Sequence, residues 1–161
     1  MRKKPGIAGG STGTSNVRPA SADRIAVLSV SPCEEDHLSL EGIIGHSNWI
    51  LLKATSLPSA LASLRRRKVG VVLCERDLPG TWVGLLEYIN TLPVPQPLIL
   101  TSRLADDRLW AEALNLGAWD VLAKPFDRGE VFRSVKSAWQ HWHDRTERPT
   151  PAMKVMMTAA S

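Results

Sequence analysis

The sequence lacks several features that would define a specialised class of protein. It has no run of the roughly 18 apolar residues that a membrane-spanning helix needs, so an integral membrane protein is excluded. It has only two cysteines, Cys33 and Cys74, which are too few for a disulfide scaffold and lack the spacing of a metal site. It has no apolar secretory signal of roughly 7–15 residues near the N-terminus, which favours a cytoplasmic location. The remaining composition, 43% apolar and 22% charged, is that of an ordinary globular protein.

The middle of the chain carries no excess of positive charge. The net charge is +4, but residues 24–143 hold thirteen cationic and thirteen acidic side chains and are therefore neutral. Residues 1–23, rich in Gly, Ser, Thr and Pro, are interpreted as a disordered basic arm. Residues 144–161 are predicted to form a flexible C-terminal tail. The few scattered cations of the arm favour a solvated segment, so nucleic-acid binding is not expected.

Five apolar, strand-like runs alternate with five helical patterns across residues 24–143. The expected strands are 24–30, 49–54, 69–74, 98–101 and 118–123. The third run is almost wholly apolar, as in a central parallel strand that is buried on both faces. Strict alternation predicts an α/β fold, a parallel sheet with helices on both faces. Such sheets bind or react at the carboxyl ends of their strands, so the residues just past each strand are candidates for a site.

Two segments carry a resemblance to a known family. The first, LCERDLPG at residues 73–80, ends the third strand. The second, NLGAWDVLAKPF at residues 115–126, contains Gly-Ala near its start and ends in Lys-Pro-Phe. It is the more specific of the two. With the alternation, these motifs make residues 24–143 resemble a response-regulator receiver domain, the phosphoacceptor module of bacterial two-component signalling. The resemblance implies a flavodoxin-like (βα)5 fold with the parallel strand order 2-1-3-4-5.

The resemblance also implies a phosphorylation site. In this family an aspartate after strand three accepts the phosphoryl group, and a hydroxyl after strand four and a lysine before a proline bind its oxygens. Glu75 stands at the acceptor position, four residues before Pro79. The hydroxyl falls on Ser102, with Thr101 as the alternative, and the lysine is Lys124. The hydroxyl and the lysine match the family, whereas the acceptor is changed.

The acidic pair that holds Mg²⁺ in the family is also changed, to Ser31 and Pro32. Mg²⁺ needs hard oxygen ligands, and this pair offers only one neutral hydroxyl. Glu34, Glu35 or Asp36 could swing toward the pocket, but all lie about a turn into the first helix. We expect them to interact with the helix dipole instead. The protein is therefore expected to need no cofactor, while Mg²⁺ held by Glu34 or Glu35 stays the alternative.

Two interpretations of Glu75 stay open. Its side chain is one methylene longer than aspartate, so it could place a carboxylate near Lys124 and Ser102 as a built-in, partial mimic of a phosphoryl group. The mimicry is partial because a phosphoryl group carries about −1.5 to −2 charges. The other interpretation is a structural ion pair with Lys124 that switches nothing.

An interaction face is predicted at the end of the domain. In the receiver family, helix four, strand five and helix five commonly form a dimer or partner surface. Trp119 and Val121 are two apart on the fifth strand and are expected to share a face. Trp139 and Trp142 are three apart on the last helix and are expected to be neighbours. Because tryptophan is enriched at interface hot spots, we expect a homodimer or another protein partner, such as a histidine kinase, to bind here.

We interpret the chain as an atypical single-domain response regulator that is not an enzyme, needs no phosphorylation and acts by protein–protein interaction. The alternative is an active phosphoacceptor of a phosphorelay that uses Glu75 or Asp77. A flavodoxin-like cofactor enzyme is disfavoured because residues 31–33, Ser-Pro-Cys, replace a Gly-rich phosphate loop. DNA binding is disfavoured because no helix-turn-helix fits in residues 144–161. No membrane interaction is expected.

Overall fold

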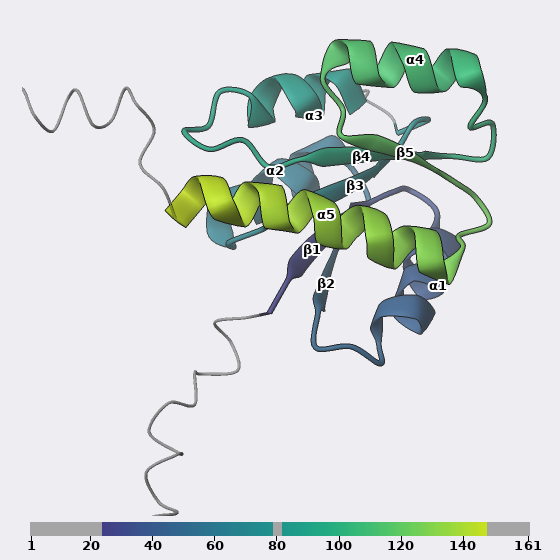
Figure 1. The fold of residues 1–161 in the computed structure, drawn as a ribbon, viewed down its shortest axis with the longest axis horizontal. Coiled ribbons are helices and arrows are strands. Elements are labelled where there is room, and N and C mark those ends of the chain that lie inside the picture. The colour runs from purple at the N-terminus through teal and green to yellow at the C-terminus, as the bar shows by residue number, and fades with distance from the viewer. Residues whose placement is uncertain (1–23, 79–81, 148–161) are drawn as a thin grey trace, which may run out of the picture.

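The computed structural model describes residues 24–78 and 82–147 (Figure 1). In chain order the elements are β1 (Ala26–Val30), α1 (Glu34–Ile44), β2 (Ile50–Ala54), α2 (Leu57–Arg66), β3 (Val71–Glu75), α3 (Trp82–Ile89), β4 (Leu98–Ser102), α4 (Asp107–Leu116), β5 (Asp120–Ala123) and α5 (Arg128–Glu147). The five strands form one parallel sheet in the order β2-β1-β3-β4-β5. The predicted alternation, fold class and strand order are confirmed.

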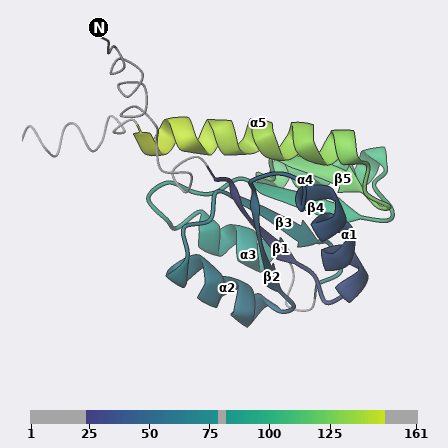
Figure 2. The same cartoon turned by 90° about the horizontal axis from the view of Figure 1, so that it is seen from below.

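The helices lie on the two faces of the sheet, and each face has its own apolar core. One core joins apolar side chains of the sheet to those of α2, α3 and α4. The other joins the opposite face of the sheet to α1 and α5. Figure 2 shows α5 at the top, with α2 and α3 on the other side of the strands. All residues of β3 and β4 are buried, as parallel strands covered on both faces must be.

Strand register brings the expected site residues to one edge of the sheet. Glu75, the last residue of β3, pairs with Thr101, and Ser102, the last residue of β4, pairs with Ala123. Lys124 therefore follows β5 beside Ser102, whose carbonyl oxygen accepts the Lys124 backbone N–H at 3.0 Å. Because all strands run in parallel, these residues lie at the same carboxyl edge.

Helix α4 ends where the sequence predicts. Gly117 caps it in the left-handed conformation, with φ of 109°, and its N–H returns to the carbonyl oxygens of Ala113 and Leu114. A residue with a Cβ atom is strained at this φ, so glycine is the favoured cap. The cap turns the chain directly into β5.

Helix α5 is longer than expected. It continues through residues 144–147, which the sequence assigned to a flexible tail. No glycine or proline interrupts the chain between residues 143 and 147, and Trp142 is buried against the sheet, so the last turns are retained. The predicted basic arm at 1–23 and the tail beyond residue 147 lie outside the described residues. In the described ranges, no helix is long and apolar enough to span a membrane.

Candidate functional site

Lys124 lies at the centre of a cluster of buried charges at the carboxyl edge of the sheet. Its Nζ is 2.8 Å from Oδ2 of Asp36, and it forms a second ion pair with Oε1 of Glu75. The three side chains are 9%, 7% and 8% exposed, respectively. A buried charge is costly unless it is paired, so the two carboxylates and the ammonium depend on one another.

The environment of Lys124 favours its charged form. Burial lowers the pKa of the ammonium, but hydrogen bonds and charge attraction from Asp36 and Glu75 outweigh burial. The pKa of Lys124 is therefore raised above its ordinary value. The lysine stays a cation at every physiological pH.

Both oxygens of the Glu75 carboxylate are occupied. Oε1 pairs with Lys124, and Oε2 accepts the backbone N–H of Asp77 at 2.8 Å. The side chain of Asp77 itself is exposed. The contact between Glu75 and Lys124 that both sequence interpretations required is therefore present.

The prediction that Asp36 interacts only with the helix dipole is wrong. Asp36 was expected to stay with Glu34 and Glu35 at the start of α1, but it is buried and reaches Lys124. Ser31 Oγ donates a hydrogen bond of 2.6 Å to Asp36 Oδ2, which supports the carboxylate from the other side. Glu34 and Glu35 are exposed, as expected for residues at a helix start.

A periodic signal could have found Asp36. The buried residues of α1 are Asp36, His37, Leu40 and Ile44. Asp36, Leu40 and Ile44 are spaced by four, so the carboxylate lies on the stripe that faces the protein interior.

His37 is a second residue that the sequence analysis missed as part of a site. It is fully buried, and its Nε2 lies 3.0 Å from the carbonyl oxygen of Ser31. A carbonyl oxygen only accepts, so Nε2 donates to it, and the other ring nitrogen, Nδ1, lies 3.0 Å from Ser29 Oγ. The imidazole thus fixes the backbone of Ser31, whose hydroxyl holds Asp36.

The two hydroxyl candidates are buried at the same edge. Ser102 Oγ accepts the backbone N–H of Leu104 at 3.0 Å, and Thr101 stands beside Glu75 in the register. Pro32 is exposed. The side-chain contacts therefore unite Lys124 with both carboxylates, while the hydroxyls are placed near them by the strands.

The residues around Lys124 do not fit Mg²⁺. The two buried carboxylates, Asp36 and Glu75, converge on an ammonium group, which would repel a divalent cation. Within residues 24–78 and 82–147, no group of three or more His, Cys, Asp or Glu side chains could hold a metal ion. A hollow of about 140 Å³ beside Asp36 and Lys124 is also lined by Glu35 and Arg103, whose charged groups lie 4.0 Å apart.

Of the two interaction residues that the sequence assigned to the fifth strand, Trp119 is accessible and Val121 is not. Trp119 is half-buried, and its ring centroid lies 4.9 Å from that of His141 on α5. Val121 is buried and packs in the core under α2, α3 and α4, whereas Trp119 packs against the opposite core. The expected shared face is wrong because Trp119 precedes β5, so strand alternation does not extend to it.

The tryptophans of α5 are neighbours, as expected, but they differ in exposure. Trp139 is half-buried and Trp142 is buried, which removes Trp142 from an exposed face. Both pack against Gly70, where an added Cβ would lie 2.7 Å from Trp139 Cδ1 and 3.3 Å from Trp142 Cε3. Because Gly70 has no side chain, this part of α5 can pack closely against the start of β3.

A five-stranded parallel sheet of this order, with a lysine and carboxylates gathered at its carboxyl edge, defines a CheY-like signalling fold. Comparison with protein families agrees. The model of the response regulator receiver domain matches residues 35–136, and the chain belongs to this family. It is therefore a response-regulator receiver domain, a signalling domain of the two-component type.

Solved structures show the same architecture. The signal receiver domain of an HD domain-containing protein from Pseudomonas fluorescens Pf-5 is 28% identical, with a TM-score of 0.72, over 83% of this chain and 99% of that one. A CheY-like receiver domain protein from Methanospirillum hungatei JF-1 is 19% identical, with a TM-score of 0.66, over 76% and 98%. The latter shows the fold alone.

Curated relatives are longer proteins. The transcriptional regulatory protein ZraR of Escherichia coli (strain K12) is 26% identical over 132 residues, 81% of this chain but 30% of the relative. The C4-dicarboxylate transport transcriptional regulatory protein DctD of Rhizobium meliloti (strain 1021) is 31% identical over 84 residues, 52% of this chain and 18% of the relative. The chain thus spans less than a third of these relatives.

Proposed function

We propose that this receiver domain acts in two-component signalling without being phosphorylated, through protein–protein interaction. One observation carries the proposal: Lys124 is held between the carboxylates of Glu75 and Asp36. In the receiver family the corresponding lysine binds phosphoryl oxygens. Here its partners are supplied by the chain itself, so the pocket contains its own anions.

Glu75 is poorly arranged to accept a phosphoryl group. In-line transfer needs a free carboxylate oxygen aimed at the phosphorus atom. One Glu75 oxygen is paired with Lys124 and the other accepts the Asp77 N–H, so attack would require breaking one of these contacts. The described residues around Lys124 do not fit Mg²⁺, whose charge would help to neutralise the incoming phosphate.

Glu75 instead acts as a resident, partial substitute for the phosphoryl group. It is buried and in contact with Lys124, which corresponds to the lysine that binds phosphoryl oxygens in the family. It carries about one negative charge where a phosphoryl group carries −1.5 to −2, so the substitution is incomplete. The domain is therefore proposed to remain in one signalling state.

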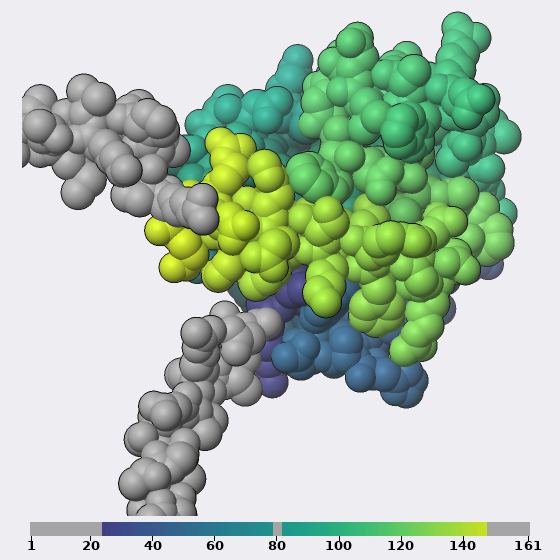
Figure 3. Space-filling model, in the orientation of Figure 1, coloured from purple at the N-terminus to yellow at the C-terminus, as the bar shows by residue number. Residues whose placement is uncertain are grey.

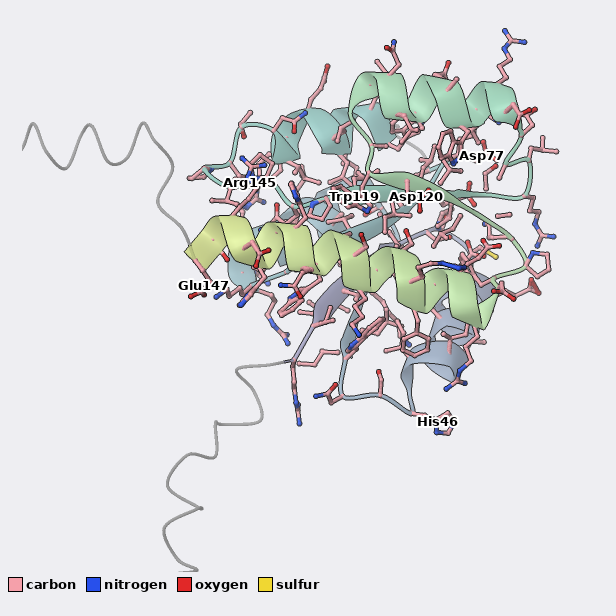
Figure 4. All side chains as sticks on the ribbon, viewed as in Figure 1. His46, Asp77, Trp119, Asp120, Arg145 and Glu147 are labelled. Carbon is pink, nitrogen blue, oxygen red and sulfur yellow. The ribbon has the colours of Figure 1, made fainter. Side chains whose placement is uncertain are left out.

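The partner surface is proposed to lie over α4, β5 and α5, whose α5 side faces the viewer in Figure 3. A hollow of about 370 Å³ there is lined by residues that include Trp119, Asp120, Glu130 and Arg133. Figure 4 places Trp119 and Asp120 beside each other above α5. A half-buried tryptophan among charged side chains is a suitable anchor for a protein partner.

Phosphotransfer tests the proposal directly. The whole chain is incubated with acetyl phosphate and Mg²⁺ and examined by intact-mass spectrometry, with an active receiver domain as the positive control. No labelling is expected, and beryllofluoride with Mg²⁺ is expected to leave the amide NMR signals of Glu75 and Lys124 unchanged.

Stable labelling would support the active phosphoacceptor instead. Loss of the label in Glu75→Gln or Asp77→Asn would then name the acceptor. Asp107→Asn, a change of an exposed acid in α4, is the matched control and should keep any label.

A further inference from the structure

A third hollow lies far from the Lys124 cluster, where the strands begin. It has a volume of about 390 Å³, and its lining includes Arg24, Lys68, Trp139, Trp142 and His143, with Glu147 at the end of α5. Figure 4 places Glu147 and Asp77 on opposite sides of the molecule. The volume is within the range of about 300–1,000 Å³ that is typical of small-molecule sites.

The walls of this hollow are aromatic and closely fitted. The rings of Trp139 and His143 are stacked, with centroids 4.5 Å apart and an interplanar angle of 14°. Trp139 and Trp142 both meet Gly70, where a Cβ atom would collide with Trp139. The arrangement offers flat, apolar surface to a ligand.

One polar group in the lining has no partner. Trp142 is 7% exposed, and its indole Nε1–H has no hydrogen-bond partner among the residues that the structure describes. Because this nitrogen atom is itself buried, its N–H signal can report on changes at the ring without being open to a ligand in the hollow.

The charges around the hollow favour an anion. Lys68 Nζ lies 5.9 Å from the Trp142 ring centroid, and Arg24 adds a second cation, against the single carboxylate of Glu147. Both cationic side chains are exposed, whereas Trp142 is buried and Trp139 is half-buried. The lining thus combines aromatic surface with an excess of positive charge.

We propose that this hollow is a binding site for a small, flat aromatic anion. The aromatic body packs beside Trp139 and Trp142, and the anionic group pairs with Lys68 and Arg24. None of these residues belongs to the Lys124 cluster, so the site is independent of the proposed phosphorylation-free signalling.

The test uses 2-naphthoate as the anionic probe and 2-naphthalenemethanol as its uncharged counterpart. The indole N–H signals of the whole chain are followed by ¹H–¹⁵N NMR, and the Trp142 signal is assigned by its loss in Trp142→Phe. A saturable shift of the Trp142 signal is expected with naphthoate, with affinity about tenfold higher than for the alcohol.

Variants separate the site from nonspecific binding. Lys68→Gln is expected to weaken naphthoate binding several-fold, whereas Lys136→Gln, a change of an exposed α5 lysine outside the lining, should leave it unchanged. No saturable shift at millimolar naphthoate would overturn the proposal. Equal affinity for the alcohol, or equal effects of the two lysine substitutions, would overturn it as well.

Discussion

Ser31 and Asp36 are joined by a hydrogen bond of 2.6 Å, in which the serine hydroxyl donates to Oδ2 of the aspartate. The same Oδ2 is 2.8 Å from Lys124 Nζ. The serine that replaces an acidic residue of the family thus orients a carboxylate from the next helix. The negative charge lost after β1 is replaced from a position five residues further along the chain.

Ser31→Ala should destabilise the fold by about 1.5–3 kcal/mol, because a hydrogen bond to a charged group is lost in a buried place. Urea denaturation measures the change. A double-mutant cycle with Asp36→Asn should give a coupling energy of at least about 0.5 kcal/mol. Additive effects of the two substitutions would show that the hydrogen bond has little energetic weight.

Lys124→Met should destabilise the protein more strongly, by about 3–5 kcal/mol, because two buried carboxylates lose their shared counter-charge. Adding Glu75→Gln and Asp36→Asn to Lys124→Met should recover part of the loss by removing those charges. The denaturant midpoints of the single and triple variants measure this loss of stability and its recovery. Lys136→Met, at an exposed position of α5, is the control and should change stability little.

Alkaline pH should reduce the contribution of Lys124 to stability. Its pKa in the folded protein is raised, so this contribution is complete below the unfolded value of about 10.4 and is lost as the pH rises through the folded value. The difference in unfolding free energy between the wild type and Lys124→Met should therefore be constant from pH 7 to 9 and shrink above about pH 10.4.

The same comparison separates Lys124 from Cys74. Burial raises the pKa of the Cys74 thiol to about 12, so its ionisation in the unfolded chain also lowers stability at alkaline pH. That loss is common to both proteins and cancels in the difference. A difference that stays constant up to pH 11.5 would contradict the assignment to Lys124.

Trp119→Ala should preserve the fold and weaken self-association or partner binding. The side chain is half-buried beside His141, so thermal unfolding should shift by only a few degrees. Sedimentation velocity and pull-down experiments measure the binding. Leu38→Ala, at an exposed apolar residue of α1, is the matched control. Unchanged association in Trp119→Ala would remove this residue from the interface.

Much of the fold could be predicted from local patterns. The alternation of apolar runs and helices predicts the parallel sheet, and Gly117 marks the end of α4 because its conformation is local. The contact of Glu75 with Lys124 followed from the family motifs at the two strand ends.

The remaining features depend on contacts between distant parts of the chain. Asp36 is buried because α1 begins where its third residue turns inward and because Lys124, 88 residues away, supplies a cation. Trp142 is buried because Gly70 on another element leaves it space. The spacing of Asp36, Leu40 and Ile44 could have indicated that Asp36 faces the interior. The cation that it meets, and the space that Trp142 fills, cannot be read from the neighbouring residues alone.

The contact of Glu75 with Lys124 has a consequence for how such a domain would carry information. A receiver that is switched by phosphate reports how much of a fixed pool is modified at a given moment. Under the proposed function, the anion that contacts Lys124 is the carboxylate of Glu75, which is encoded in the sequence and cannot be removed by a phosphatase. The strength of the signal would then follow the number of protein copies in the cell, set by synthesis and degradation.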